Sequence, residues 1–184
     1  MDSMEILSKM FDEELRKNLD FRFAVSRFGL HGEIISAVIS SATEYGFWVY
    51  AEHVQRQIGG AYSVDNIEAL TRFGRTDLML YHPDLQNFGF VEVETGEELS
   101  DKHIGDQIEQ FKEVISTPLL ANNTFVALII GRKENERGRV VRAAKQKLKR
   151  LSSRSEIFFV DIIIEKMEDC FRICKFTSDR LSVI

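Results

Sequence analysis

The sequence predicts an α/β fold in which helices flank a central mixed β-sheet, and three observations lead to this prediction. Segments typical of strands alternate with amphipathic helical segments over residues 88–164, as they do in crossover units. Residues 124–131 are apolar almost throughout, as expected of a strand covered on both faces. The chain has 184 residues, 44% of them hydrophobic, so residues 1–184 can form a single domain around one core.

The first part of the chain predicts two helices and a strand. Apolar residues recur at helical spacing over residues 3–19 and over about 31–45, and Gly46 ends the second helix. Residues 47–52, FWVYAE, are aromatic and β-branched and therefore favour a strand. In the segment 54–73, QRQIGGAYSVDN is typical of a loop, and NIEALTRFG is compatible with a short helix.

A hairpin and a helix are expected next. Strands are predicted over residues 75–81 and 88–95, and the turn sequence HPDLQN between them makes them a hairpin. Residues 102–115 form an amphipathic pattern typical of a helix, and Pro118 follows it.

The last part of the chain predicts two strands and a helix after the strand at 124–131. A basic helix is expected over residues 135–151 and a strand over 156–164. Residues 169–176, DCFRICKF, alternate between polar and apolar side chains and predict an edge strand.

The bulk composition narrows the class of protein. The net charge of −5 argues against a surface covered in basic charge, although a local basic patch can still bind nucleic acid. Cys170 and Cys174 would lie roughly 13 Å apart on one strand, too far for a disulfide between them. We therefore expect two reduced thiols in a cytoplasmic protein. The acidic, amphipathic N-terminus does not resemble a signal peptide, and no apolar run reaches membrane-spanning length.

Three carboxylates fall within the predicted hairpin. Glu92 and Glu94 share one face of their strand, roughly 7 Å apart, and Asp77 lies in the neighbouring strand. Because adjacent strands are about 4.8 Å apart, the hairpin can bring all three together. Such hard oxygen ligands suit Mg²⁺ or Mn²⁺. The alternative is that Glu92 and Glu94 simply face solvent on a half-exposed strand.

The order of these motifs resembles the PD-(D/E)XK nuclease superfamily over residues 33–130. Asp77 in GRTDLMLY matches the first motif, and Glu92 in VEVET matches the acidic residue of the second. Glu33 matches an acidic residue on the preceding helix. Gln107 and Gln110, in GDQIEQF, resemble the glutamine of the following helix. The resemblance implies a restriction-endonuclease-like core over about residues 31–164 and a metal-dependent DNA endonuclease acting in recombination, repair or restriction.

The resemblance also implies a role for each matched residue. Asp77 and Glu92 would hold the metal ion, aided by the backbone carbonyl of Val93. Glu94 would ligate a second ion or accept a proton from the attacking water, and Glu33 would contact metal-bound water. Gln107 would position the water or the neighbouring strand, although a polar residue on a helix is more often simply exposed.

Two departures from the family pattern leave alternatives open. Thr76 replaces the proline of the first motif, and Glu94 stands where lysine is usual. Either Lys102 or Lys112 brings a charge into the site, or the site is degenerate and the fold binds nucleic acid or a protein partner without cutting. A third alternative is an unrelated α/β domain in which the acidic pair lies on the surface and has no function.

Partner surfaces are also indicated. Residues 132–154 hold ten Lys or Arg against two Glu, and helical spacing aligns several of these cations. The residues expected to contact DNA phosphates are Arg139, Arg142, Lys145 and Lys149. The alternative is a solvated helix face. We expect a homodimer, because cutting two strands needs two sites. The helix over residues 3–19 lies outside the expected catalytic core and is a candidate dimerisation element.

Histidine and tryptophan side chains suggest no further site. The four histidines, at positions 31, 53, 82 and 103, show no metal-ligand spacing. His82 falls in the predicted turn and is expected to be exposed. Phe47 and Trp48 are expected in the core and not on a base-stacking surface.

Overall fold

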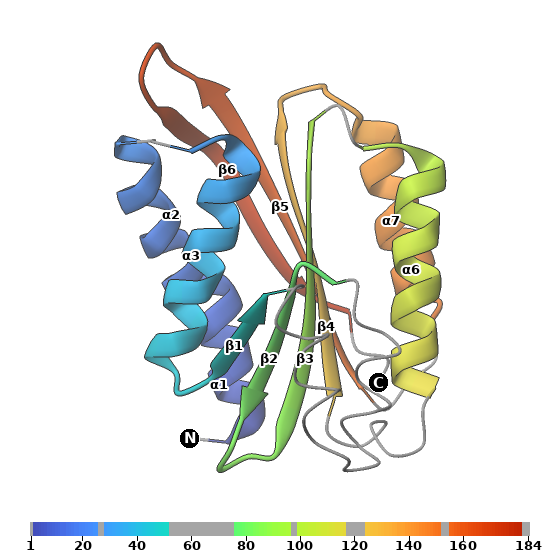
Figure 1. Ribbon diagram of the computed structural model, residues 1–184. Coiled ribbons are helices and arrows are strands. Elements are labelled where there is room, and N and C mark those ends of the chain that lie inside the picture. The colour runs from blue at the N-terminus through green and yellow to red at the C-terminus, as the bar shows by residue number, and fades with distance from the viewer. Residues whose placement is uncertain are drawn as a thin grey trace.

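A six-stranded mixed β-sheet with helices on both faces forms the centre of the molecule (Figure 1). The computed structural model describes residues 2–25, 28–51, 76–96, 99–116, 124–151 and 155–181. This architecture confirms the predicted α/β class and the mixed sheet. The predicted loop and short helix over residues 54–73 lie outside the described residues.

The strands follow one another across the sheet in sequence order, β1-β2-β3-β4-β5-β6. Pairing is parallel between β3 and β4 and between β4 and β5, and antiparallel elsewhere. The predicted hairpin of β2 and β3 is confirmed, as is the edge position of β6. The strands are β1 Trp48–Ala51, β2 Leu78–His82, β3 Asn87–Thr95, β4 Thr124–Lys133, β5 Glu156–Lys166 and β6 Phe171–Arg180.

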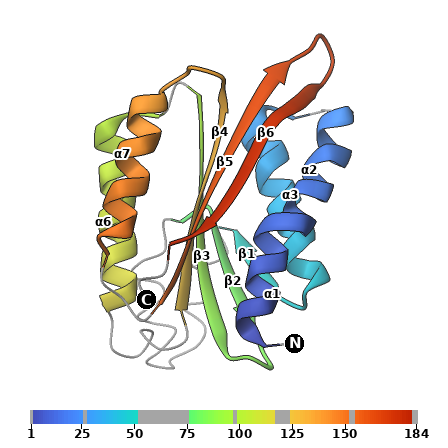
Figure 2. The ribbon, with the colours of Figure 1, turned by 180° about the vertical axis from the view of Figure 1, so that it is seen from behind.

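The N-terminal helices cover one face of the sheet and belong to its core. Helical segments α1 Ser3–Lys9, η1 Met10–Glu14 and α2 Leu15–Ala24 run on from one another, and α3 Leu30–Glu44 lies beside them. Asp2 caps the start of α1 by accepting a hydrogen bond from the backbone N–H of Glu5. The second view shows β6 on the side of these helices (Figure 2), and α2 packs against it.

This N-terminal helix, although expected outside the catalytic core, contributes to the hydrophobic core of the chain. Its apolar stripe is fully buried against the sheet, where each large side chain contributes roughly 1.5–3 kcal/mol. These side chains are Leu7, Phe11, Leu15, Leu19 and Phe23. Since the stripe is used within the chain, it no longer gives a reason to place a dimer contact there.

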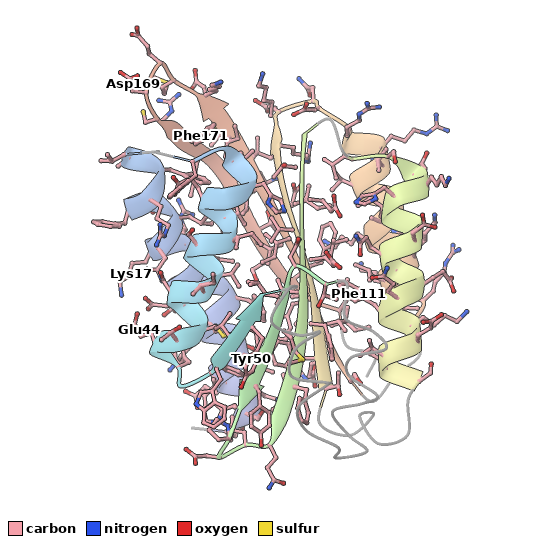
Figure 3. The ribbon with its side chains drawn as sticks, in the orientation of Figure 1. Lys17, Glu44, Tyr50, Phe111, Asp169 and Phe171 are labelled. Carbon is pink, nitrogen blue, oxygen red and sulfur yellow. The ribbon has the colours of Figure 1, made fainter. Side chains whose placement is uncertain are left out.

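Two further helices cover the opposite face. Helices α6 Asp101–Ser116 and α7 Gly138–Lys149 pack against each other, and Phe111 of α6 points toward the sheet (Figure 3). Helix α7 begins three residues later than predicted, because Asn135 and Arg137 adopt left-handed backbone angles, with φ of 64° and 53°. Those angles form a turn and prevent the helix from starting earlier.

The sheet separates two apolar clusters. Strand β4 alternates between them, with Phe125, Ala127 and Ile129 on the side of α1–α3 and Val126, Leu128 and Ile130 on the side of α6 and α7. The prediction that this strand is covered on both faces is confirmed. Close packing requires glycine at position 89, where a Cβ would lie 2.0 Å from the Phe125 ring.

Two aromatic positions differ from expectation. His82 is buried at the end of β2, where its ring lies edge-on to Phe47 with centroids 5.0 Å apart. Trp48 is 55% exposed and contacts Tyr81 on the neighbouring strand. Alternation along β1 explains the second result, because Phe47 and Trp48 are adjacent and point to opposite faces.

Candidate active site

Asp77 and Glu92 meet where β2 ends beside β3. Pairing begins at Leu78 opposite Val91, so β3 continues past the end of its partner. Asp77 directly precedes β2, one residue outside the strand in which it was predicted. Its Oδ2 accepts a hydrogen bond from the backbone N–H of Val93 at 2.8 Å. In a strand the N–H and C=O of one residue point to the same side, so the Val93 carbonyl faces this edge as well.

The two carboxyl groups differ in charge because their environments differ. Burial first, and then the neighbouring charge of Asp77, raise the pKa of Glu92 to about 10. Burial also acts to raise the pKa of Asp77, but hydrogen bonds from His31 and from the Val93 N–H hold it below its usual value. At neutral pH the pair therefore holds one proton, on Glu92, beside an ionised Asp77.

Glu94 lies next to this pair and points to α6. Both Glu92 and Glu94 are only 2% exposed, so the alternative that they face solvent is wrong. Oε1 of Glu94 is 2.9 Å from His103 Nε2 and accepts a hydrogen bond from Gln107 Nε2 at 3.3 Å. Gln107 is therefore engaged in the site and is not simply an exposed polar residue.

Three oxygen atoms in this part of the structure lack a donor. Oε1 of Glu92, Gln107 and Gln110 are buried and have no hydrogen-bond partner among the described residues. An unpaired buried acceptor costs about 1–3 kcal/mol, so such atoms indicate a place for a cation or for water. Of these three residues, Glu92 is the one whose side chain also forms a hydrogen bond with Asp77.

The ligand set fits a hard divalent cation better as a pair than as a triad. Within the described ranges, no group of three or more His, Cys, Asp or Glu side chains could hold a metal ion. The expected metal ligands Asp77 and Glu92 do lie together, with the Val93 carbonyl on the same edge, while Glu94 is directed to α6. Mg²⁺ needs only one or two carboxylates because it keeps several of its waters.

Glu33 contacts α2 and the chain just before α3. Its carboxylate accepts a hydrogen bond from the backbone N–H of Phe28 at 3.0 Å and lies 3.8 Å from Arg22 Nη1. The buried charge of Glu33 thus ties α3 to α2. The residue of α3 that reaches the carboxylates is His31, whose Nε2 lies 3.5 Å from Asp77 Oδ2.

Lys102 and Lys112 do not supply the missing lysine. Both line a cavity between α6 and α7, together with Lys147 and Arg150 of the second helix. The ammonium group of Lys112 lies 3.7 Å from Glu109. The basic side chain of α6 that contacts Glu94 is His103.

The sequence analysis did not assign His31 or His103 to the site, although the position of His103 in the sequence could have indicated its role. His103 precedes Gln107 by four residues, and this spacing places both on one face of a helix. No local pattern connects His31 with Asp77, because the two lie on elements separated by β1 and by residues 52–75.

The basic face of α7 is only partly free. Arg139, Arg142 and Lys149 are exposed, but Lys145 Nζ lies 2.6 Å from Asp179 Oδ2 and 5.8 Å from the centre of the Phe159 ring. This ion pair ties α7 to β6 and engages the ammonium group of Lys145, whose contact with phosphate stays a prediction.

Comparisons with protein-family models, with curated protein sequences and with solved structures gave no match. Among the described residues, no helix combines the length and the apolar character needed to cross a membrane.

Proposed function

We propose that this chain is a metal-dependent nuclease that hydrolyses phosphodiester bonds in DNA through Asp77 and Glu92. The observation that supports this most directly is the buried, unpartnered Oε1 of Glu92 beside the ionised Asp77. A divalent cation between the two would satisfy that oxygen and would offset the repulsion that keeps Glu92 protonated.

The order of elements around the pair supports the resemblance to the PD-(D/E)XK nucleases. Helix α3, the strands β1 to β3, helix α6 and strand β4 follow one another in the order expected for that core. Asp77 stands at the start of β2, and Glu92 lies on β3. The third alternative, an acidic pair that only decorates the surface, does not agree with the burial of Glu92.

In this proposal Asp77, Glu92 and the Val93 carbonyl hold Mg²⁺ or Mn²⁺. The metal supplies an activated water and offsets the charge of the phosphate. His31 orients Asp77 from α3. Glu92 must release its proton when the metal binds, so metal affinity should rise with pH.

Glu94, His103 and Gln107 form the second part of the proposed site. Glu94 is held by the two α6 side chains, and His103 is 46% exposed, so a substrate could reach it. Histidine can transfer protons near neutral pH. The family resemblance leads one to expect a basic lysine at position 94. In this proposal position 94 is a glutamate, and His103 beside it supplies the basic group.

Cleavage of a mixed panel of DNA tests the proposal. Linear duplex, single strand, flap and four-way junction would each be incubated with Mg²⁺ and with Mn²⁺. The matched variants are Asp77→Ala and Asp84→Ala, since Asp84 is an exposed residue in the turn of the same hairpin. Wild type and Asp84→Ala should cut, and Asp77→Ala should be slower by about 100-fold or more. Cleavage that survives in Asp77→Ala would refute the assignment of the site.

A second function is favoured by one observation, the glutamate at position 94. A catalytically degenerate module would bind DNA, for instance through Arg139, Arg142 and Lys149, without cutting it. Binding by wild type with no cleavage of any substrate would favour this alternative. The homodimer stays a prediction, which light scattering of the purified protein would test.

A further inference from the structure

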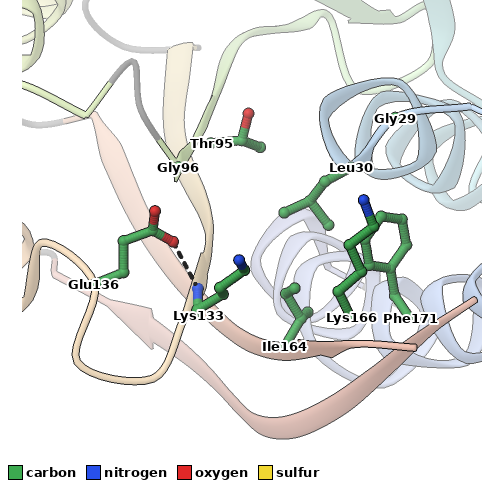
Figure 4. A pocket seen from close by; sticks show the side chains of 9 residues that line it. All are labelled: Gly29, Leu30, Thr95, Gly96, Lys133, Glu136, Ile164, Lys166 and Phe171. Carbon is green, nitrogen blue, oxygen red and sulfur yellow. Dashed lines mark hydrogen bonds between the residues drawn. The ribbon is translucent and has the colours of Figure 1, made fainter. Parts of the chain in front are cut away.

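A cavity of about 450 Å³ opens beside the first turn of α3, at the ends of β3 and β4 (Figure 4). Leu30, Ile164 and Phe171 give it an apolar floor. Lys133 and Lys166 enter from the ends of β4 and β5, and Figure 4 shows both side chains extending toward Leu30. A cavity with an apolar floor and cationic walls suits an organic anion.

The charges of this cavity are not balanced within the described chain. Neither Lys133 nor Lys166 forms an ion pair with another described residue. Among the described residues, the one carboxylate that lines the cavity belongs to Glu136, and its Oε2 accepts a hydrogen bond from the backbone N–H of Lys133 at 3.0 Å. Glu168 and Asp169 line a smaller adjoining cavity on the far side of Lys166. The ammonium groups are thus available to an anionic ligand.

One wall of the cavity is held in place before any ligand binds. Arg132 forms two hydrogen bonds with Asp161, at 2.9 and 2.8 Å, and is almost completely buried. Its Nη1 also donates to the backbone carbonyl of Glu136 at 3.2 Å. The turn that carries Lys133 and Glu136 is therefore fixed to β5, which lowers the entropy cost of binding there.

The cavity adjoins the candidate active site on two elements. Leu30 lines the cavity, and the next residue, His31, contacts Asp77. Thr95 lines it as well, on the face of β3 opposite to Glu94, because successive side chains of a strand point to opposite faces. The cavity and the carboxylates thus share the first turn of α3 and the end of β3, and a strand of nucleic acid that passes from the carboxylates across the end of β3 would bring a further phosphate to the cavity.

We propose that this cavity binds a phosphate group of the nucleic-acid strand, next to the phosphodiester bond at Asp77 and Glu92. The inference rests on the proposed function for its choice of ligand. Lys133 and Lys166 bind the phosphate oxygens, and the apolar floor packs against the adjoining sugar or base. A free phosphate ion is also an anion, but it has no sugar or base that could pack against the apolar floor. The experiment below distinguishes a free phosphate ion from a nucleic-acid strand.

The test measures DNA binding without metal, so that it does not depend on cleavage. Fluorescence anisotropy of a labelled short oligodeoxythymidine in EDTA would be recorded over a range of salt concentrations. The variant combines Lys133→Ala with Lys166→Ala. The matched control combines Lys9→Ala with Lys175→Ala, which removes the same charge from one half-exposed and one exposed position outside the cavity.

The expected result is a several-fold loss of affinity in the cavity variant and a smaller salt dependence. Each phosphate contact with a single strand contributes about 0.7 to the slope of log K against log salt, so two lost contacts should lower the slope by about 1.4. The control should retain the wild-type slope. Circular dichroism would confirm that both variants are folded.

Equal slopes in the cavity variant and the wild type would overturn the inference, whatever the cleavage panel shows. Backbone amide shifts of Gly29 and Gly96 on addition of inorganic phosphate, without any on addition of the oligonucleotide, would overturn the assignment to a strand. A smaller salt slope in the cavity variant, together with no cleavage of any substrate by the wild type, would support phosphate binding in the cavity and would count against the proposed nuclease activity. The two proposals can therefore fail separately.

Discussion

Replacing Glu92 with glutamine should stabilise the metal-free protein at neutral pH. Glutamine has nearly the shape of the protonated carboxyl group that the folded state prefers. The pKa of Glu92 is about 10 in the folded protein against an ordinary value of 4.5. Above pH 4.5 the unfolded chain therefore releases a proton that the folded chain keeps, and this difference favours unfolding.

The size of the effect follows from the pH interval. Each unit above the ordinary pKa costs about 1.4 kcal/mol, so at pH 7 the wild type should lose about 3 kcal/mol from this group. The contribution of Glu92 is fully present below about pH 4.5 and declines as pH rises toward 10. Asp77 acts in the opposite sense. Its lowered pKa stabilises the folded state by a constant amount above its ordinary value of 3.8, and this contribution is lost only as pH falls below that value, so it does not alter the trend between about pH 5 and pH 8.

Urea denaturation in EDTA, followed by far-ultraviolet circular dichroism between about pH 5 and pH 8, measures this difference. The free energy of unfolding of Glu92→Gln should exceed that of the wild type by an amount that grows with pH. Glu109→Gln, at an exposed site on α6, should follow the wild type. Mg²⁺ should stabilise the wild type more than Glu92→Gln, because the glutamine lacks the charge that the cation needs.

A constant difference between wild type and Glu92→Gln across this pH range would refute the reasoning. It would mean that the carboxyl group is ionised in the folded protein, and therefore that burial and the charge of Asp77 do not hold its proton. The proposed exchange of that proton for a metal ion would then lose its basis.

Three further substitutions test the packing and the polar contacts. Gly89→Ala should destabilise the fold by about 1–3 kcal/mol or more, because the new Cβ meets the buried ring of Phe125; thermal unfolding measures this. Arg132→Ala should cost about 3–5 kcal/mol, because it leaves a carboxylate on β5 without its partner; an unchanged denaturation midpoint would contradict that reading. His103→Ala should slow cleavage far more than it weakens DNA binding, since it removes the contact to Glu94, and kcat and Kd compared side by side decide the point.

Much of the fold could be predicted because its signals are local. Strand β3 begins one residue before its predicted start and ends at the predicted residue, and strand β4 begins where its apolar run begins. Other bounds were less accurate: β2 and α7 each begin three residues later than predicted. The start of α7 depends on backbone angles in the preceding turn. An apolar run or a helical spacing is a property of neighbouring residues and can be read without knowing the partners.

The candidate site was predictable only in part, for the same reason. The period of two along a strand places Glu92 and Glu94 on one face, and the hairpin brings Asp77 alongside. Glu33 matched a pattern, but Arg22 holds its carboxylate away from the site. Lys145 matched a helical face, but Asp179 lies opposite it on β6. Each of these outcomes depends on a residue far away in the chain.

By itself the sequence determined the α/β class, the hairpin and the pairing of Asp77 with Glu92, because hydrophobic period and turn chemistry act over a few residues. The tertiary structure alone decided that the N-terminal helix lies in the core. It also decided that His31 and His103 approach the carboxylates, and that Glu92 keeps a proton. These properties come from burial and from charges brought together by the fold, which no local pattern of residues encodes.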